Sequence, residues 1–127
     1  MSHFIVDTNA FLRLLLDDVP KQADKVEKLF KEAEVKKHKL TVPQIVIFEL
    51  SYAFEKYYEL TKEEIIEKVD TTLAMNYLTI QNRELFQEAL EIFRNNNLSL
   101  ADCFIYCFAQ KRNAEIFTFD KALQKLT

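Results

Sequence analysis

Residues 3–16 read HFIVDTNAFLRLLL and join a short apolar segment to an apolar helix through a single carboxylate, Asp7. Residues 3–6 have the length and composition of a buried strand, and residues 8–16 are predicted to be a helix. A strand that stops at an acid and continues directly as a helix is typical of an α/β unit. The rest of the chain shows whether this unit is repeated.

The alternation of strand and helix continues to the end of the sequence. Further strands are predicted at 39–43, 77–80 and 115–119. Helices are predicted at 21–39, after residue 43 to about 58, 61–75, 82–95, 99–110 and 120–126. This order predicts an α/β fold, a three-layer sandwich whose short, mostly parallel central sheet is flanked by helices, with the strand at 3–6 central. No repeat or linker divides the chain, so we expect residues 1–127 to form a single domain.

Composition excludes several classes of protein. The chain has no glycine, which excludes the glycine-rich phosphate loop and the dinucleotide-binding fingerprint. Its longest apolar runs are too short to cross a bilayer, and its N-terminus does not resemble a secretory signal. Two cysteines, Cys103 and Cys107, are too few for a zinc site. We therefore expect a cytoplasmic protein without membrane contact, in which both thiols are reduced and buried.

Two aspartates follow predicted strands directly, Asp7 after residues 3–6 and Asp120 after residues 115–119. Ligands of parallel α/β folds bind beyond the carboxyl ends of the strands, where both aspartates are expected. Each aspartate could instead cap the helix that follows it. Taken singly, neither position distinguishes a cap from a ligand.

Two further acids lie on apolar helices. Glu49 lies at the border of the apolar stripe formed by Val46, Leu50 and Phe54, too far into its helix to be a cap. Asp102 opens the apolar helix at 99–110, and with Ser99 it also fits the S-x-x-D capping box. An exposed flank and a helix cap therefore stay open as alternatives to a shared site.

If the four acids converge, their mutual repulsion requires compensation. A hard dication such as Mg²⁺ or Mn²⁺ prefers carboxylate oxygens and water, and it needs no histidine. Once bound, it can activate a water molecule and neutralise charge on a phosphoryl group. The two histidines, His3 and His38, are expected to be ordinary surface residues.

Four segments of the chain resemble the motifs of the PIN-domain nucleases, in particular the VapC-type toxin endoribonucleases. They are IVDTNAFLRLLL, VPQIVIFELSYAFEKYYELTKEEI, LSLADCFIYCFAQ and IFTFDKAL, in the family's order and spacing over nearly the whole chain. The resemblance implies four catalytic acids that bind one or two Mg²⁺ or Mn²⁺ ions, namely Asp7, Glu49, Asp102 and Asp120. It also implies that Asn9 and Thr118 support these acids by hydrogen bonding, and that a metal-activated water attacks an RNA phosphodiester.

The same resemblance implies partners. It points to the toxin of a type II toxin–antitoxin system, whose cognate antitoxin would insert a basic side chain among the acids. Tyr52, Tyr57 and Tyr58 cannot all face the core of their own helix, so we expect some of them in a homodimer interface or an antitoxin groove. The formal charge of −3 does not exclude RNA, because without the four acids the chain sums to +1 and residues 21–39 carry seven lysines.

Other classes fit less well. A receiver domain would need further acids beside Asp7, and a haloacid-dehalogenase-type phosphatase would need an aspartate where Asn9 stands. Two alternatives stay open. One is a PIN-like module that binds RNA or protein without cutting, and the other is an RNA-processing nuclease outside a toxin–antitoxin pair.

Overall fold

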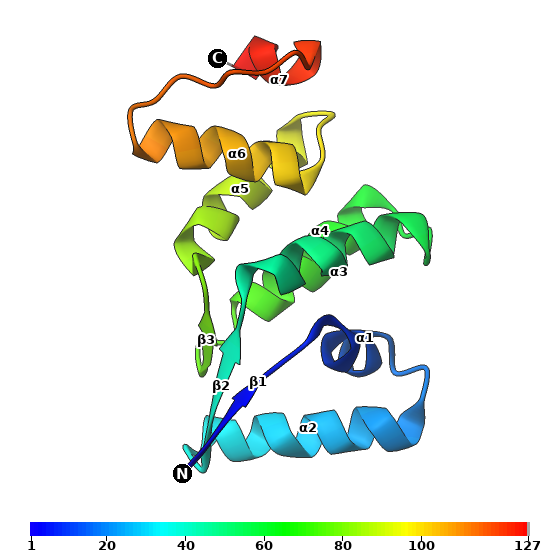
Figure 1. Cartoon of the computed structure of the whole chain (residues 1–127). Helices are drawn as coiled ribbons and strands as arrows, with labels where there is room; N and C mark the ends of the chain where they lie inside the picture. Colours follow the sequence, from blue (N-terminus) through cyan, green and yellow to red (C-terminus); the bar gives the residue numbers. More distant parts are fainter. Residues whose placement is uncertain (127) are drawn as a thin grey trace. The chain divides into compact units, whose positions relative to one another are not determined.

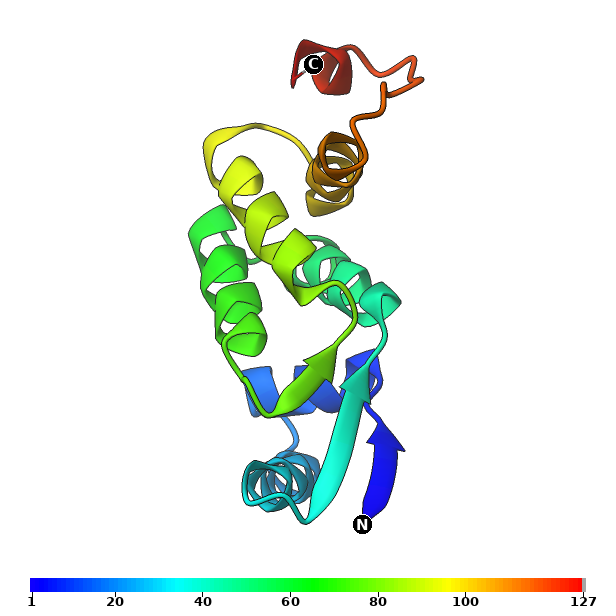
Figure 2. The same cartoon turned by 90° about the vertical axis from the view of Figure 1, so that its left-hand side faces the viewer.

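Three short strands form a parallel sheet in the order β1-β2-β3 (Figure 1). They are β1 (Ser2–Ile5), β2 (His38–Val42) and β3 (Leu78–Ile80). Figure 2 shows them side by side and pointing the same way. In the register of the sheet, Ile5 lies opposite Thr41 and Thr41 opposite Thr79. The computed structural model describes residues 1–126, which divide into two units, Met1–Gln81 and the segment from Asn82 onward.

Two helices lie between each pair of successive strands, because parallel strands need a long crossover connection. Helices α1 (Thr8–Leu16) and α2 (Pro20–Glu34) connect β1 to β2, and α3 (Gln44–Lys56) and α4 (Lys62–Leu73) connect β2 to β3. Their apolar faces bury the core of the first unit, whose largest fully buried side chains include Phe11, Leu40, Ile47, Leu50 and Phe54. The predicted α/β class and parallel sheet are confirmed.

Helix α2 ends at Glu34, five residues before the predicted end at 39. Lys36 adopts a left-handed conformation with φ of 66°, which stops the helix and turns the chain into β2 at His38. The chain has no glycine, so other residues occupy such positions. Within the described residues the left-handed positions are held by Asp17, Lys36, Glu59, Asn82 and Asn113.

Helix α4 begins as the sequence predicts, at a complete capping box. The Thr61 hydroxyl accepts from the Glu64 backbone N–H at 3.2 Å, and Glu64 Oε1 accepts from the Thr61 backbone N–H at 2.9 Å. The Thr61 backbone N–H and side chain both hydrogen-bond to the Glu64 carboxyl, which lowers its pKa. The box satisfies two of the backbone donors that every helix start leaves unpaired.

The second unit consists of helices α5 (Arg83–Asn95), α6 (Leu100–Lys111) and α7 (Lys121–Leu126). Helices α5 and α6 pack through Phe86 and Phe104, whose ring centroids lie 4.8 Å apart. Cys103 and Cys107 are buried in α6 and form no disulfide, as predicted. Burial raises the pKa of the Cys107 thiol, which favours its protonated form.

The predicted fourth strand at 115–119 is absent from the described structure, and that prediction is wrong. These residues form an extended segment outside any sheet, in which Phe117 is 90% and Phe119 88% exposed. A strand requires a neighbour with which to exchange backbone hydrogen bonds, and apolar composition alone does not provide one. For the same reason β2, and not the predicted 3–6 strand, is central among the three strands.

None of the helices among residues 1–126 is long and apolar enough to cross a membrane.

The capping box of α4 gives a prediction about stability. We expect Thr61→Ala to lower the free energy of unfolding by about 1 kcal/mol in urea denaturation, because the helix loses its side-chain cap. Thr71→Ala is the matched control on the same helix: its exposed hydroxyl donates to the Glu67 carbonyl inside the helix. That control should leave stability unchanged or slightly raised, since alanine is the better helix former. An equal decrease in the free energy of unfolding in the two variants would contradict a stabilising role for the Thr61 cap.

Candidate active site

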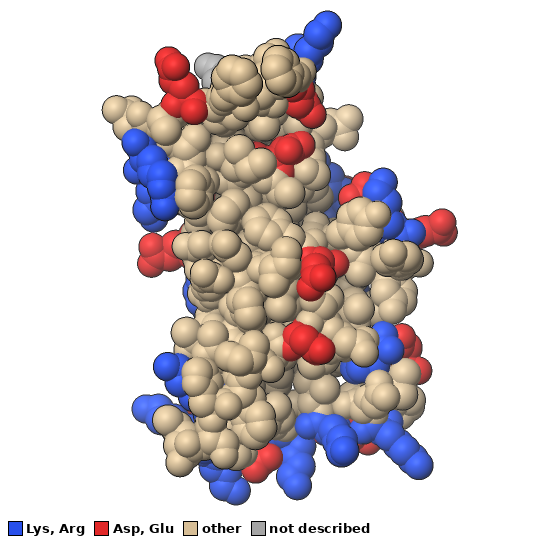
Figure 3. All heavy atoms as spheres, viewed as in Figure 1, with Lys and Arg blue, Asp and Glu red and all other residues tan. Residues whose placement is uncertain are grey.

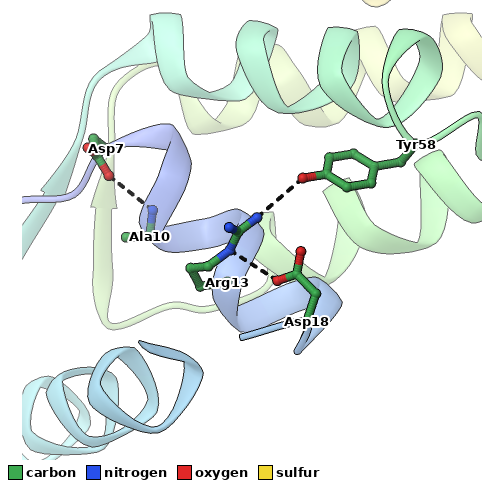
Figure 4. Close-up of polar contacts among 5 residues, drawn as sticks. All are labelled: Asp7, Ala10, Arg13, Asp18 and Tyr58. Atoms are coloured by element: carbon green, nitrogen blue, oxygen red, sulfur yellow. Dashed lines mark hydrogen bonds and ion pairs between the residues drawn. The ribbon is translucent and has the colours of Figure 1, made fainter. Parts of the chain in front are cut away.

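Asp7 lies at the carboxyl end of β1 and caps α1. Its Oδ1 accepts from the Ala10 backbone N–H at 3.0 Å, as Figure 4 shows. The side chain is exposed, and this cap uses only one of its two carboxylate oxygens. Capping therefore fixes the direction of Asp7 and leaves Oδ2 for a ligand.

Glu49 is tied to the same end of the sheet by Thr8. The Thr8 hydroxyl donates to Glu49 Oε1 at 2.6 Å, although 41 residues separate them in sequence. Glu49 itself is exposed on α3, between the buried residues Ile47 and Leu50. Glu49 is therefore bonded to the residue that directly follows Asp7.

Thr8 is the residue that reasoning from the sequence missed. It lies between Asp7 and Asn9, and nothing in the spacing shows that its hydroxyl reaches a glutamate on another helix. The only available signal was its place next to an acid at a strand end. Asn9 is exposed in the first turn of α1, and its predicted supporting role stays a prediction.

A hollow of about 470 Å³ opens beside Glu49 in the first unit. The residues that line it come from the start of α1 and from α3 and its C-terminal end: Thr8, Phe48, Glu49, Tyr52, Ala53 and Tyr57. Its wall thus combines one carboxylate and one hydroxyl with aromatic rings. A larger hollow of about 490 Å³ lies along α2, away from the predicted acids.

Arg13, the arginine of the first motif, does not belong to the acidic site. Figure 4 shows its guanidinium between Tyr58, whose hydroxyl it meets at 3.2 Å, and Asp18, whose Oδ1 lies 3.1 Å from Arg13 Nε. The contact with Asp18 is an ion pair without the alignment of a hydrogen bond. Only 16% of the Arg13 side chain is exposed, so it fastens α1 to the end of α3 and holds Tyr58 in place.

Asp102 lies in the first turn of α6 and is half-buried. The cap of this helix is Ser99, whose Oγ accepts from the Asp102 backbone N–H at 3.1 Å. Asp102 therefore contributes its N–H to the cap, and its carboxylate is left for another role. The sequence left open whether Asp102 is a cap or a ligand. Because Ser99 supplies the capping oxygen, Asp102 is not the cap of α6.

Asp120 begins α7, where its Oδ1 accepts from the backbone N–H groups of Ala122 at 2.9 Å and Leu123 at 3.1 Å. The Thr118 hydroxyl accepts from the Asp120 backbone N–H at 3.0 Å. Thr118 thus orients the turn that carries Asp120 and does not touch its carboxylate. As with Asp7, one oxygen caps the helix and Oδ2 takes no part in this cap.

The four acids are divided between the two units, with Asp7 and Glu49 in the first and Asp102 and Asp120 in the second. Within either unit, the described residues contain no group of three or more His, Cys, Asp or Glu side chains able to hold a metal ion. Between the first two acids, the link is indirect: Glu49 is hydrogen-bonded to Thr8, the residue that follows Asp7. His3 bonds the Thr41 hydroxyl and His38 lies against Glu32, so both histidines take part in packing around β2, as ordinary residues.

The lysines of α2 form a mixed rather than a purely basic face. Figure 3 shows Lys and Arg side chains along the lower edge of the view, where α2 lies, with acidic side chains among them. Lys31 pairs with Glu27 at 2.8 Å, which raises the pKa of Lys31, and Lys37 lies 3.8 Å from Glu32. The interleaved acids reduce the attraction of this face for a phosphate backbone.

Comparison with known proteins identifies relatives over nearly the whole chain. The PIN domain family matches residues 4–127. The chain is 29% identical over 123 residues to the VapC ribonuclease of Aquifex aeolicus (strain VF5), an alignment that covers 96% of this chain and 90% of that protein. Both matches span the two units described above.

The cap of α6 gives a test that needs no activity. We expect Ser99→Ala to lower the free energy of unfolding by about 1 kcal/mol, because Ser99 supplies the capping oxygen. Asp102→Asn keeps the backbone N–H that Ser99 binds, so its effect in metal-free protein should stay within about 0.5 kcal/mol. Thermal or urea denaturation of both variants measures this difference. A larger loss for Asp102→Asn than for Ser99→Ala would make Asp102 the cap.

Proposed function

Because the chain belongs to the PIN domain family, we propose that it is an endoribonuclease, the toxin of a type II toxin–antitoxin system. The observation that carries the proposal is the 29% identity to a VapC ribonuclease over 96% of the chain. We propose further that residues 1–127 act as a single nuclease domain. The runner-up functions are an RNA-processing nuclease outside such a pair and a module that binds without cutting.

We propose that Asp7, Glu49, Asp102 and Asp120 hold one or two Mg²⁺ or Mn²⁺ ions. The donor set fits this assignment, because four carboxylates without histidine or cysteine suit a hard dication. Asp7 and Asp120 use one oxygen each for a helix cap, and Asp102 leaves its carboxylate out of the cap of α6. Each acid thus has an oxygen that its helix does not need.

The bound ion would lower the pKa of a coordinated water and neutralise charge on the scissile phosphate. The protein's own contribution is to orient the ligands before the ion arrives. The α1 cap fixes Asp7, and the Thr8 hydroxyl fixes Glu49 through Oε1, which leaves Oε2 for a ligand. Asn9 and Thr118 complete the proposal as supporting residues, Thr118 through the backbone of Asp120.

The proposed partners follow from the same assignment. They are an RNA substrate, a cognate antitoxin protein and a second copy of the chain in a homodimer. Free, buried Cys103 and Cys107 support a reducing compartment, and we propose the cytoplasm. A module that does not cut RNA has no need of all four acids, and all four are present here.

Metal dependence gives the first test. We expect the purified protein to cleave single-stranded RNA in Mn²⁺ or Mg²⁺, to lose this activity in EDTA and to regain it when Mn²⁺ is restored. Cleavage is measured by gel electrophoresis of labelled RNA. Specific RNA binding without cleavage in either metal would favour the non-catalytic module. Cleavage that survives EDTA would contradict the metal site.

Asp102 gives the second test, with Asp70→Asn on the exposed face of α4 as the matched control. Asp102→Asn should abolish RNA cleavage because it removes a charged ligand, whereas Asp70→Asn should cut as the wild type does. Mn²⁺ should raise the melting temperature of the wild type and of Asp70→Asn, and that of Asp102→Asn much less. Normal cleavage and equal stabilisation by Mn²⁺ in Asp102→Asn would remove Asp102 from the site.

A further inference from the structure

Two neighbouring tyrosine rings, one on α3 and one at its C-terminal end, are exposed to solvent. Tyr52 is 56% and Tyr57 75% exposed, and their ring centroids lie 6.1 Å apart with planes at 76°. Tyr58 differs from them, because Arg13 binds its hydroxyl. The fold therefore uses Tyr58 for its own packing and leaves the rings of Tyr52 and Tyr57 for another contact.

Both rings line the hollow beside Glu49. At about 470 Å³ the hollow is within the size range of small-molecule sites, and its lining combines several apolar groups with few polar ones. None of the described residues that line it is Lys or Arg. An uncharged, flat occupant therefore suits the hollow better than a phosphate group does.

The hollow also lies next to the proposed chemistry. Glu49 and Tyr52 are three residues apart on α3, so their side chains are neighbours on one face of the helix. Thr8, which binds Glu49, lines the same space. A group resting on Tyr52 thus lies within about one helical turn of a proposed catalytic acid.

We propose that this hollow binds an unpaired base of the RNA, stacked on one ring of the Tyr52–Tyr57 pair with its edge against the other, at or beside the nucleotide whose phosphodiester is cut. The proposal rests on the ribonuclease function proposed above and adds the mode of substrate binding. Unpaired bases stack readily on aromatic side chains, and stacking is tolerant of base identity.

The charge of the protein explains why stacking is needed. The formal charge is −3 and the lysines of α2 are interleaved with acids, so attraction to the phosphate backbone is weak. Stacking supplies affinity that does not depend on charge. It also selects single-stranded RNA, because bases inside a duplex do not expose their faces.

The test uses metal-free protein in EDTA and two fluorescein-labelled probes: a short single-stranded oligoadenylate, and the same ribose-phosphate chain without bases. Tyr52→Leu and Tyr57→Leu keep apolar bulk but remove the ring, and Tyr52→Phe and Tyr57→Phe keep the ring. Fluorescence anisotropy should show about tenfold weaker binding of oligoadenylate to each leucine variant and near wild-type binding to each phenylalanine variant. Binding of the abasic probe should be the same for all five proteins.

Cleavage in Mn²⁺ gives a second measurement. Each leucine variant should raise KM for a single-stranded RNA and change kcat little, because the ring binds substrate without touching the reacting atoms. Leucine variants with wild-type affinity and KM would overturn the proposal. An equal loss of affinity for the oligoadenylate and for the abasic probe would also overturn it. A change from dimer to monomer with unaltered RNA affinity would assign the rings to a protein interface and also overturn it.

The two proposals fail separately. A wild-type protein that binds bases through these tyrosines and cuts no RNA supports the stacking site and rejects the nuclease. Equal RNA cleavage by the wild type and the two leucine variants rejects the stacking site alone.

Discussion

The parallel pairing of β1 with β2 is the constraint on which the first half of the site depends. Ile5 lies opposite Thr41, and the Val6 backbone N–H donates to the Thr41 carbonyl at 3.0 Å, so both strands end at the same edge. The residues that follow, Thr8 on one side and α3 on the other, therefore leave the sheet together. The Thr8–Glu49 hydrogen bond is possible only because of this shared edge.

The sequence predicts best where a local signal decides the structure. The starts of α1 and α4 follow from Asp7 and Thr61, whose side chains cap their own helices. It predicts less well where the outcome depends on distant partners. The apolar run at 115–119 looked like a strand, but no periodicity shows whether a neighbour is present, and Thr8 gave no sign of its bond to Glu49. The end of α2 was missed because Lys36 is an unusual residue for a left-handed turn.

In the proposed metal site, two of the four acids would be both a helix cap and a ligand. Asp7 and Asp120 each cap a helix with one oxygen, and the backbone donors hold the carboxylate in a fixed direction. In α6 the cap and the acid are different residues: Ser99 caps the helix, and Asp102 lies three residues later. Helix starts are thus a means of presenting carboxylates rigidly, and the capping signals in the sequence are compatible with a metal site.

The absence of glycine has a consequence for the freedom of the chain. Asp17 closes α1 in a left-handed conformation, and Glu59 takes one in the turn after α3; such a conformation costs a residue with a Cβ roughly 1–2 kcal/mol. A glycine would relieve that strain but would widen the set of shapes open to the unfolded chain, and the two effects largely offset each other. The difference is in the folded turns, where a residue with a Cβ has fewer backbone conformations available than glycine has. The turns that follow α1 and α3 therefore have fewer alternative backbone conformations than turns built on glycine would have.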